Sequence, residues 1–282
     1  MAKVSEQTDT ATRMGLHQEQ LKGRTQQVFF EVEEDGQFAY ADSPDVDFNK
    51  RAEFDATDLS PTDINARLRD LMRAGYGTIK VHNPGAKHGL GVGILNRLHL
   101  YFDGSLGYFG CGLIDGPNVH ISGRVGWSAG ENMMAGTVTI EKNAGSCFGA
   151  ALRGGDLVCK GNVGARTGID MKGGTIIVGG HTGAFSGFMM QRGRMIILGN
   201  TGHNLGDSMY DGMIYCAGSI SSLGIDAVED EMTDLDVQWL ERKLKSYEME
   251  APNGVRNMRK IVAGKKLWNY DNLEPTEKKL II

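Results

Sequence analysis

Apolar positions in the middle of the chain recur with a spacing of 19 residues. Two columns of positions, two residues apart, hold only apolar residues or cysteine: Leu100, Val119, Val138, Leu157, Ile176, Met195, Ile214, and Phe102, Ile121, Ile140, Cys159, Val178, Ile197, Cys216. Residues two apart in a strand point to the same side. Each repeat is therefore predicted to contain one short strand that turns two side chains inward.

A third apolar column and several glycine columns keep the same period. The third inward column consists of Met133, Leu152, Met171, Met190 and Met209. The glycines follow a G-x-x-G-x-x-x-G pattern, with series that begin at Gly107, Gly130 and Gly136, and a fourth that begins at Gly123 and is broken by Lys142. Forty of the 282 residues are glycine, whereas only 6 are proline. Sharp corners that need a positive φ or a close backbone approach account for such a pattern.

A repeat of 19 residues predicts a parallel right-handed β-helix. One unit cannot bury its apolar face alone, so neighbouring units must stack. Helical solenoids need longer repeats, and these repeats are rich in glycine and β-branched residues. The register also predicts that Val178→Asp, which buries a carboxylate, destabilises the protein far more than Thr182→Asp.

Four segments are predicted along the chain. Residues 1–26 are polar and form a flexible arm, and residues 27–97 form an N-terminal cap of strand, helix and strand. Residues 98–224 form the β-helix, and residues 225–282 form a C-terminal helix and tail.

Local signals place the elements of the two flanking segments. The run 28–33 is expected to be a strand, and Ser60-Pro61 begins a helix because serine is a good N-cap and proline fits the first turn. Residues 78–81 are predicted to form the next strand. In the C-terminal segment, Val237, Leu240 and Leu244 lie on one helical face.

Charge and hydropathy exclude two classes of partner. The formal net charge is −5, with 30 basic and 35 acidic residues, which disfavours a nucleic-acid binder. No apolar run approaches the length of a signal peptide or of a membrane span. We therefore expect a cytoplasmic protein that binds neither nucleic acid nor membrane.

The cysteines and glycines do not match known catalytic or cofactor motifs. Cys111, Cys147, Cys159 and Cys216 lie too far apart in sequence for a zinc or iron–sulfur motif. Cys159 and Cys216 are expected in the core, about 14 Å apart at three rungs' separation, which is too far for a disulfide. The run 89–93 reads G-x-G-x-G rather than the dinucleotide-binding G-x-G-x-x-G.

Other polar and aromatic residues leave two interpretations open. His82, His88, His99, His181 and His203 form hydrogen bonds at the surface or, alternatively, bind a metal. Asp170, Lys172 and Asp207 belong to a solvated corner or contact a partner. Trp127 and the pair Phe185 and Phe188 pack under a loop or, if exposed, anchor a partner. We predict no catalytic, cofactor-binding or metal-binding residue in this chain.

These features resemble the C-terminal β-helix (GXGXG) domain of the glutamate synthase large subunit, over roughly residues 55–225. The closer similarity is to the stand-alone form found in methylamine–glutamate N-methyltransferase (N-methylglutamate synthase) complexes. The resemblance is carried by Ile64-Asn65, Leu68-Arg69, residues 81–84, 88–93 and 103–108, Gly126-Trp127, residues 131–134, 164–168 and 171–174, Gly187-Phe188-Met189 and residues 206–210.

The resemblance implies a non-catalytic scaffold subunit of a hetero-oligomer. It implies two kinds of partner: a glutamine-amidotransferase-like subunit and an FMN-dependent glutamate-synthase-like subunit. The FMN and an iron–sulfur cluster would belong to a partner, and no cofactor would be bound by this chain.

Two alternatives remain open. One is the β-helix subunit of formylmethanofuran dehydrogenase or of a formyltransferase/hydrolase complex, which shares the repeat. The other is a polysaccharide-cleaving β-helix enzyme, but the acids of the repeat, Asp156, Asp170, Asp207 and Asp211 among them, form no paired set in register.

Overall fold

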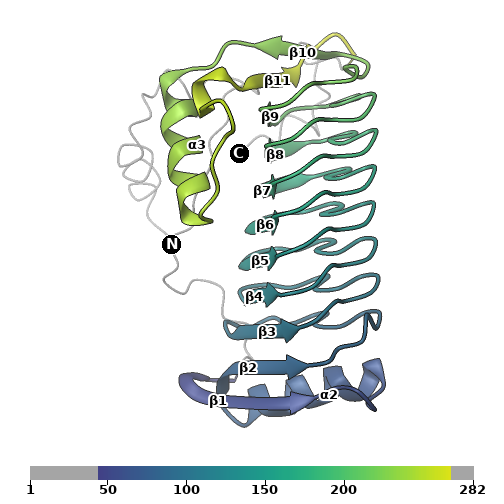
Figure 1. The fold of residues 1–282 in the computed structure, drawn as a ribbon, viewed down its shortest axis with the longest axis vertical. Helices are drawn as coiled ribbons and strands as arrows, with labels where there is room; N and C mark the ends of the chain where they lie inside the picture. The colour runs from purple at the N-terminus through teal and green to yellow at the C-terminus, as the bar shows by residue number, and fades with distance from the viewer. Residues whose placement is uncertain (1–43, 268–282) are drawn as a thin grey trace, which may run out of the picture. The chain divides into compact units, whose positions relative to one another are not determined.

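The structure, a computed structural model, describes residues 44–267. The predicted arm at 1–26, the predicted strand at 28–33 and the end of the tail lie outside the described residues. The described chain forms a stack of parallel strands flanked by two α-helices (Figure 1). The elements are β1 (Asp47–Asp55), α2 (Pro61–Arg73), β2 (Tyr76–His82), β3 (His99–Asp103), β4 (Asn118–Ile121), β5 (Thr137–Ile140), β6 (Asp156–Cys159), β7 (Lys172–Val178), β8 (Arg192–Ile197), β9 (Met213–Cys216), β10 (Ala227–Asp230), α3 (Asp234–Ser246), the 3₁₀ turn η2 (Val255–Asn257) and β11 (Arg259–Ala263).

The strands pair in the register that the sequence predicts. Asn118 of β4 pairs with Thr137 of β5, which pairs with Asp156 of β6, so that each step advances by one 19-residue repeat. The sheet order is β1 to β9 in sequence, all parallel, followed by β11 and β10, which are antiparallel. The predicted β-helix is thereby confirmed.

All three predicted inward columns are buried. Every member of the two strand columns and of the methionine-rich column has at most 3% of its surface exposed. A fourth inward column, which the pattern did not reveal, contains Val125, Val163, Thr182 and Thr201. The premise of the expected contrast between Val178→Asp and Thr182→Asp, that only Val178 faces the interior, is therefore wrong, because both side chains are buried.

The glycine series that begins at Gly130 lies at a left-handed turn over the core. Gly130 has φ +69°, and a Cβ there would come within 2.7 Å of the Leu157 side chain. Two residues to either side, Ser128 and Asn132 are also left-handed, yet they point outward and keep their side chains. The requirement for glycine thus comes from the core beneath it as well as from φ.

The N-terminal end of the stack is closed by β1, β2 and α2. The Ser60 side chain accepts a hydrogen bond from the Asp63 N–H, and Pro61 occupies the first turn, as predicted. Ile64 and Leu68 turn into the core. Because β1 pairs in parallel with β2, and β2 pairs in parallel with β3, the cap continues the sheet of the β-helix.

The C-terminal helix α3 lies along the outer face of the second half of the sheet (Figure 1). In β6 to β9 the outward column is apolar or aromatic, and it is buried against α3: Val158, Ile177, Ile196 and Tyr215. The helix contributes Trp239, Leu240 and Leu244 to this second core. In β3 to β5 the same column contains Tyr101, His120 and Thr139, which are not buried.

Candidate functional site

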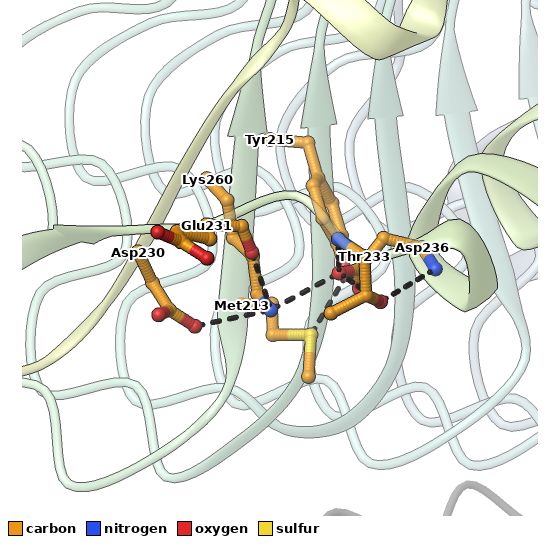
Figure 2. Close-up of polar contacts among 7 residues, drawn as sticks. All are labelled: Met213, Tyr215, Asp230, Glu231, Thr233, Asp236 and Lys260. Carbon is orange, nitrogen blue, oxygen red and sulfur yellow. Dashed lines mark hydrogen bonds and ion pairs between the residues drawn. The ribbon is translucent and has the colours of Figure 1, made fainter.

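The most buried charged groups of the described chain join α3 and β11 to β9 (Figure 2). The Tyr215 hydroxyl donates to Asp236 Oδ1 at 2.6 Å, and Lys260 Nζ lies 3.1 Å from Asp236 Oδ2. Lys260 also forms an ion pair with Asp230 at 3.1 Å. Thr233 completes the set through a capping box with Asp236 at the start of α3.

The pKa shifts in this cluster are those of a structural contact. Burial alone would raise the pKa of Asp236, but hydrogen bonds from Tyr215, Thr233 and Lys260 outweigh it and lower that pKa. Burial raises the pKa of Tyr215, and the adjacent carboxylates add to the effect. Both shifts move the pKa of the group further from 7. A general acid or base, in contrast, works best with a pKa near the operating pH. The cluster therefore fastens the C-terminal segment to the solenoid.

A second set of contacts fixes the other end of α3. Lys243 Nζ lies 2.9 Å from a carboxylate oxygen of Asp156 in β6, and the Tyr247 hydroxyl donates to the same oxygen. Arg194 of β8 stacks on the Trp239 ring, with its guanidinium carbon 4.1 Å from the ring centre. These contacts hold α3 in place over β6 to β9.

The cysteine thiols lie mostly in the interior. Burial raises the pKa of Cys111 to about 12 and that of Cys159 to about 11, and it raises that of Cys216 as well. Cys159 and Cys216 occupy the interior column as predicted, and both are free. Since the thiolate is the reactive form, these three thiols are inert at neutral pH. Cys147 is free and only half-buried.

Two of the histidines have carboxylate partners on neighbouring strands or rungs. His82 lies between Glu53 at 3.3 Å and Asp103 at 3.4 Å, and His120 lies 3.0 Å from Glu141. Within residues 44–267, no group of three or more His, Cys, Asp and Glu side chains has a geometry that could hold a metal ion.

Two acidic residues of the repeat, Asp170 and Asp207, each have their own hydrogen-bond or ion-pair partners and do not face one another as a pair. Asp170 pairs with Lys172 at 2.5 Å and accepts from Gln191, and Asp207 is buried and accepts from the Ile225 N–H. A small pocket between α2 and the first coil, with a volume of about 10 Å³, holds no more than one water. These acids and this pocket do not form a substrate cleft.

Exposed aromatic side chains on the first two full coils form the clearest candidate contact surface. The exposed fractions are 58% for Trp127, 45% for Tyr108, and 51% for both Phe109 and Leu113. The rings of His88, Tyr108 and Trp127 stack from rung to rung, with centroid distances of 4.5 and 5.6 Å. Exposed Trp and Tyr in a rigid setting are typical anchors of protein interfaces.

Sequence reasoning found only part of this surface. Trp127 was a candidate anchor, and its exposure favours that interpretation. Phe185 and Phe188, which pack edge to face at 5.9 Å, are half-buried on later rungs. Tyr108 lies 19 residues before Trp127, so applying the repeat to exposed positions would have found it.

The comparisons with known proteins agree with the repeat and with the fold. The family model described as "GXGXG motif" matches residues 57–251, which is more than half of the chain. The chain belongs to the GXGXG motif family. The GXGXG match begins just before α2 and ends just after α3, so it includes the helix that covers the sheet as well as the stacked coils.

Among solved structures, this GXGXG protein is similar to a chain of the formyltransferase/hydrolase complex (FhcABCD) from Methylorubrum extorquens, determined in complex with methylofuran. The alignment has a TM-score of 0.55 and 22% identity, and it covers 73% of this chain and 88% of the other. At this identity the similarity establishes a shared fold. No curated protein matches the chain.

Proposed function

We propose that this chain is a non-catalytic scaffold subunit of a glutamate-synthase-like complex. The observation that carries the proposal is the contrast between the interior and the surface. The buried ionisable groups tie the chain to itself, whereas large aromatic side chains on two coils face solvent. Membership of the GXGXG family supports the same role.

The partners in this proposal are a glutamine-amidotransferase-like subunit and an FMN-dependent glutamate-synthase-like subunit. The FMN and an iron–sulfur cluster would reside on the flavin subunit, and the complex would be cytoplasmic. In the N-methylglutamate synthase form of the proposal, the complex converts methylamine and glutamate to N-methylglutamate and ammonia. This finer assignment rests on the sequence motifs that the chain shares with the stand-alone GXGXG subunits.

A second candidate is a subunit of a formyltransferase/hydrolase complex. It is favoured by the structural similarity to a chain of FhcABCD, which extends over most of both chains. The two candidates share the scaffold role and differ in the enzymes that the scaffold holds.

Purification of the tagged full-length chain from its native cell tests the role and separates the candidates. We expect other subunits to copurify in fixed ratio. A flavoprotein and an amidotransferase-like protein would support the first candidate, and amidohydrolase-like and formyltransferase subunits the second. A chain that purifies without other proteins, even after mild cross-linking in the cell, would contradict the scaffold role.

A further inference from the structure

The outward side chains at the left-handed turns form a surface along the stack, here called the outer wall. The size of these side chains changes from rung to rung. The first column of outward positions begins with two bulky residues, continues with three small ones and ends with a histidine: Tyr108, Trp127, Ser146, Ala165, Ala184, His203. All six side chains are exposed or half-buried, and the wall between them is formed by successive rungs. The same face therefore carries projections on its first two rungs, shallow positions on the next three and one more projecting ring at His203.

The projections are rigid before any partner binds. Tyr108 is stacked between His88 and Trp127, and its backbone N–H donates to His88 Nδ1 at 2.9 Å. Little side-chain entropy would be lost when these rings are covered. An exposed apolar patch of this kind marks an interaction surface on a soluble protein.

We propose that two copies of this chain pack face to face along this wall, antiparallel, about a two-fold axis at the rung of Ser146 and Cys147. This axis lies in the contact plane and runs perpendicular to the direction of stacking. It places each column of one copy opposite the same column of the other copy, with the order of the rungs reversed. Trp127 then lies opposite Ala165 of the partner subunit, and Tyr108 lies opposite Ala184 of the partner subunit. Bulky side chains thus meet small ones at both ends of an isologous interface.

The neighbouring columns agree with the same axis. Phe109 comes to face Phe185 of the partner subunit, and Leu113 comes to face Met189 of the partner subunit, so apolar residues meet apolar ones. A parallel arrangement would instead place Trp127 against its own copy. The size pattern therefore selects the antiparallel packing.

Charge complementarity supports the same pairing. Glu131 lies one rung before the proposed axis, and Arg166 lies one rung after it in a column three residues away, so the two-fold brings the two charges onto facing rungs twice without placing them directly opposite each other. Arg166 is exposed and Glu131 is half-buried. Opposite charges on facing rungs favour association and fix the register of the two copies. A parallel pair would place each of these charges on the same rung as its own copy.

Sedimentation of the full-length chain over a range of concentrations, together with thiol cross-linking, tests the proposal. Cys147 is the one cysteine of the four that is not buried, and the axis passes through its rung. We expect a dimer that a short bis-maleimide links through Cys147 of both copies. A monomer at all concentrations, or a dimer that does not cross-link at Cys147, would overturn the proposal.

Charge reversal distinguishes this interface from any other. We expect Glu131→Arg and Arg166→Glu each to weaken dimerisation at least about tenfold, and the double variant to recover most of the loss. Arg242→Glu, the same kind of reversal on the exposed side of α3, is the matched control and should leave the dimer unchanged. Circular dichroism checks that each variant is folded.

Two results would overturn the second-copy assignment. One is a dimer that responds equally to all three reversals. The other is a monomeric chain in which Trp127→Ala abolishes copurification of a different subunit, because the wall would then belong to that subunit.

Discussion

At the scale of single residues, a polar ladder connects successive rungs at the corner that follows the strands. The Asn162 N–H donates to Asn143 Oδ1 at 2.9 Å, and the His181 N–H donates to Asn162 Oδ1 at 2.8 Å. These acceptor atoms occupy the space that a Cβ on the glycine of the next rung would fill. A Cβ on Gly161 would lie 2.4 Å from Asn143 Oδ1, and a Cβ on Gly180 would lie 2.1 Å from Asn162 Oδ1.

The ladder explains why Lys142 interrupts a glycine series. On the preceding rung, the residue equivalent to Asn143 is Arg124. Its guanidinium has no acceptor atom, so no acceptor fills the space beside position 142 and a side chain fits at that position. Arg124→Asn alone should increase stability little, because the new amide and the Lys142 side chain would compete for the same space. Arg124→Asn combined with Lys142→Gly should be more stable than the two single effects predict, by about 1 kcal/mol.

Urea unfolding of the four proteins in this double-mutant cycle measures the coupling. Asn143→Ala, which removes an existing ladder acceptor, is the reference and should destabilise the protein by about 1 kcal/mol. Strictly additive effects of Arg124→Asn and Lys142→Gly would show that the ladder does not determine where glycine is required.

At the scale of elements, α3 covers the outer face of β6 to β9, so this half of the sheet is buried on both faces. In β5, Val138 is buried but the adjacent Thr139 is not, whereas in β7 both Ile176 and Ile177 are fully buried. Ile177→Asp should therefore destabilise the protein by at least about 3 kcal/mol, since it places an unpaired carboxylate under the helix. Thr139→Asp is the matched control and should change the unfolding free energy by less than about 1 kcal/mol.

Thermal and urea unfolding compare the two variants. Similar stabilities for Ile177→Asp and Thr139→Asp would mean that α3 does not cover β7 in solution.

The buried Asp236 gives the attachment of α3 a defined dependence on pH. Its folded-state pKa is lowered from an ordinary value of 3.8, so its contribution is complete above that value and is lost as the pH falls through the folded pKa. Asp236→Asn should lower stability at neutral pH by roughly 3 kcal/mol because Lys260 loses a buried partner. The variant should also lose less stability than the wild type between about pH 5 and pH 2.

Asp234→Asn is the matched control for Asp236→Asn. Asp234 lies two residues earlier on α3, and its side chain is 77% exposed in an ion pair with Arg256. Its loss should cost less than about 1 kcal/mol at neutral pH. Parallel acid-unfolding curves for wild type and Asp236→Asn would contradict the role of this carboxylate.

The elements that the sequence predicts well are those with a local or periodic signal. The strands β3 to β9 follow the 19-residue period, and α2 begins at a serine N-cap. The burial of α3 on the sheet was not predicted, although a signal exists. β4 and β5 alternate (Asn-Val-His-Ile, Thr-Val-Thr-Ile), whereas the ends of β7 and β8 are uninterrupted apolar runs (Ile-Ile-Val, Met-Ile-Ile). Such runs are typical of strands buried on both faces.

Other features lie beyond a single sequence. The bond between Tyr215 and Asp236 and the ion pair between Asp236 and Lys260 join segments 21 and 24 residues apart. No motif marks such contacts, because they depend on how the C-terminal segment folds back. β10 and β11 were missed for the same reason: both are short and rich in charge, and they become strands only because β11 pairs with β9 and β10 pairs with β11.

At the scale of the whole molecule, the faces of the described stack are used differently. The N-terminal end is closed by α2, the second half of the sheet is covered by α3, and the described residues of a single chain leave the wall with Tyr108 and Trp127 exposed for the proposed second copy. No helix among the described residues is long and apolar enough to cross a membrane. The chain thus combines a body held together by many internal contacts with an exposed contact surface, as expected of a subunit that assembles with other chains.

Native mass spectrometry of the intact assembly tests the scaffold role most directly. We predict an assembly in which other polypeptides carry the cofactor mass, and from which this chain is released at the mass of its bare polypeptide or a multiple of it. Release of this chain with a tightly bound flavin, cluster or metal would contradict the account.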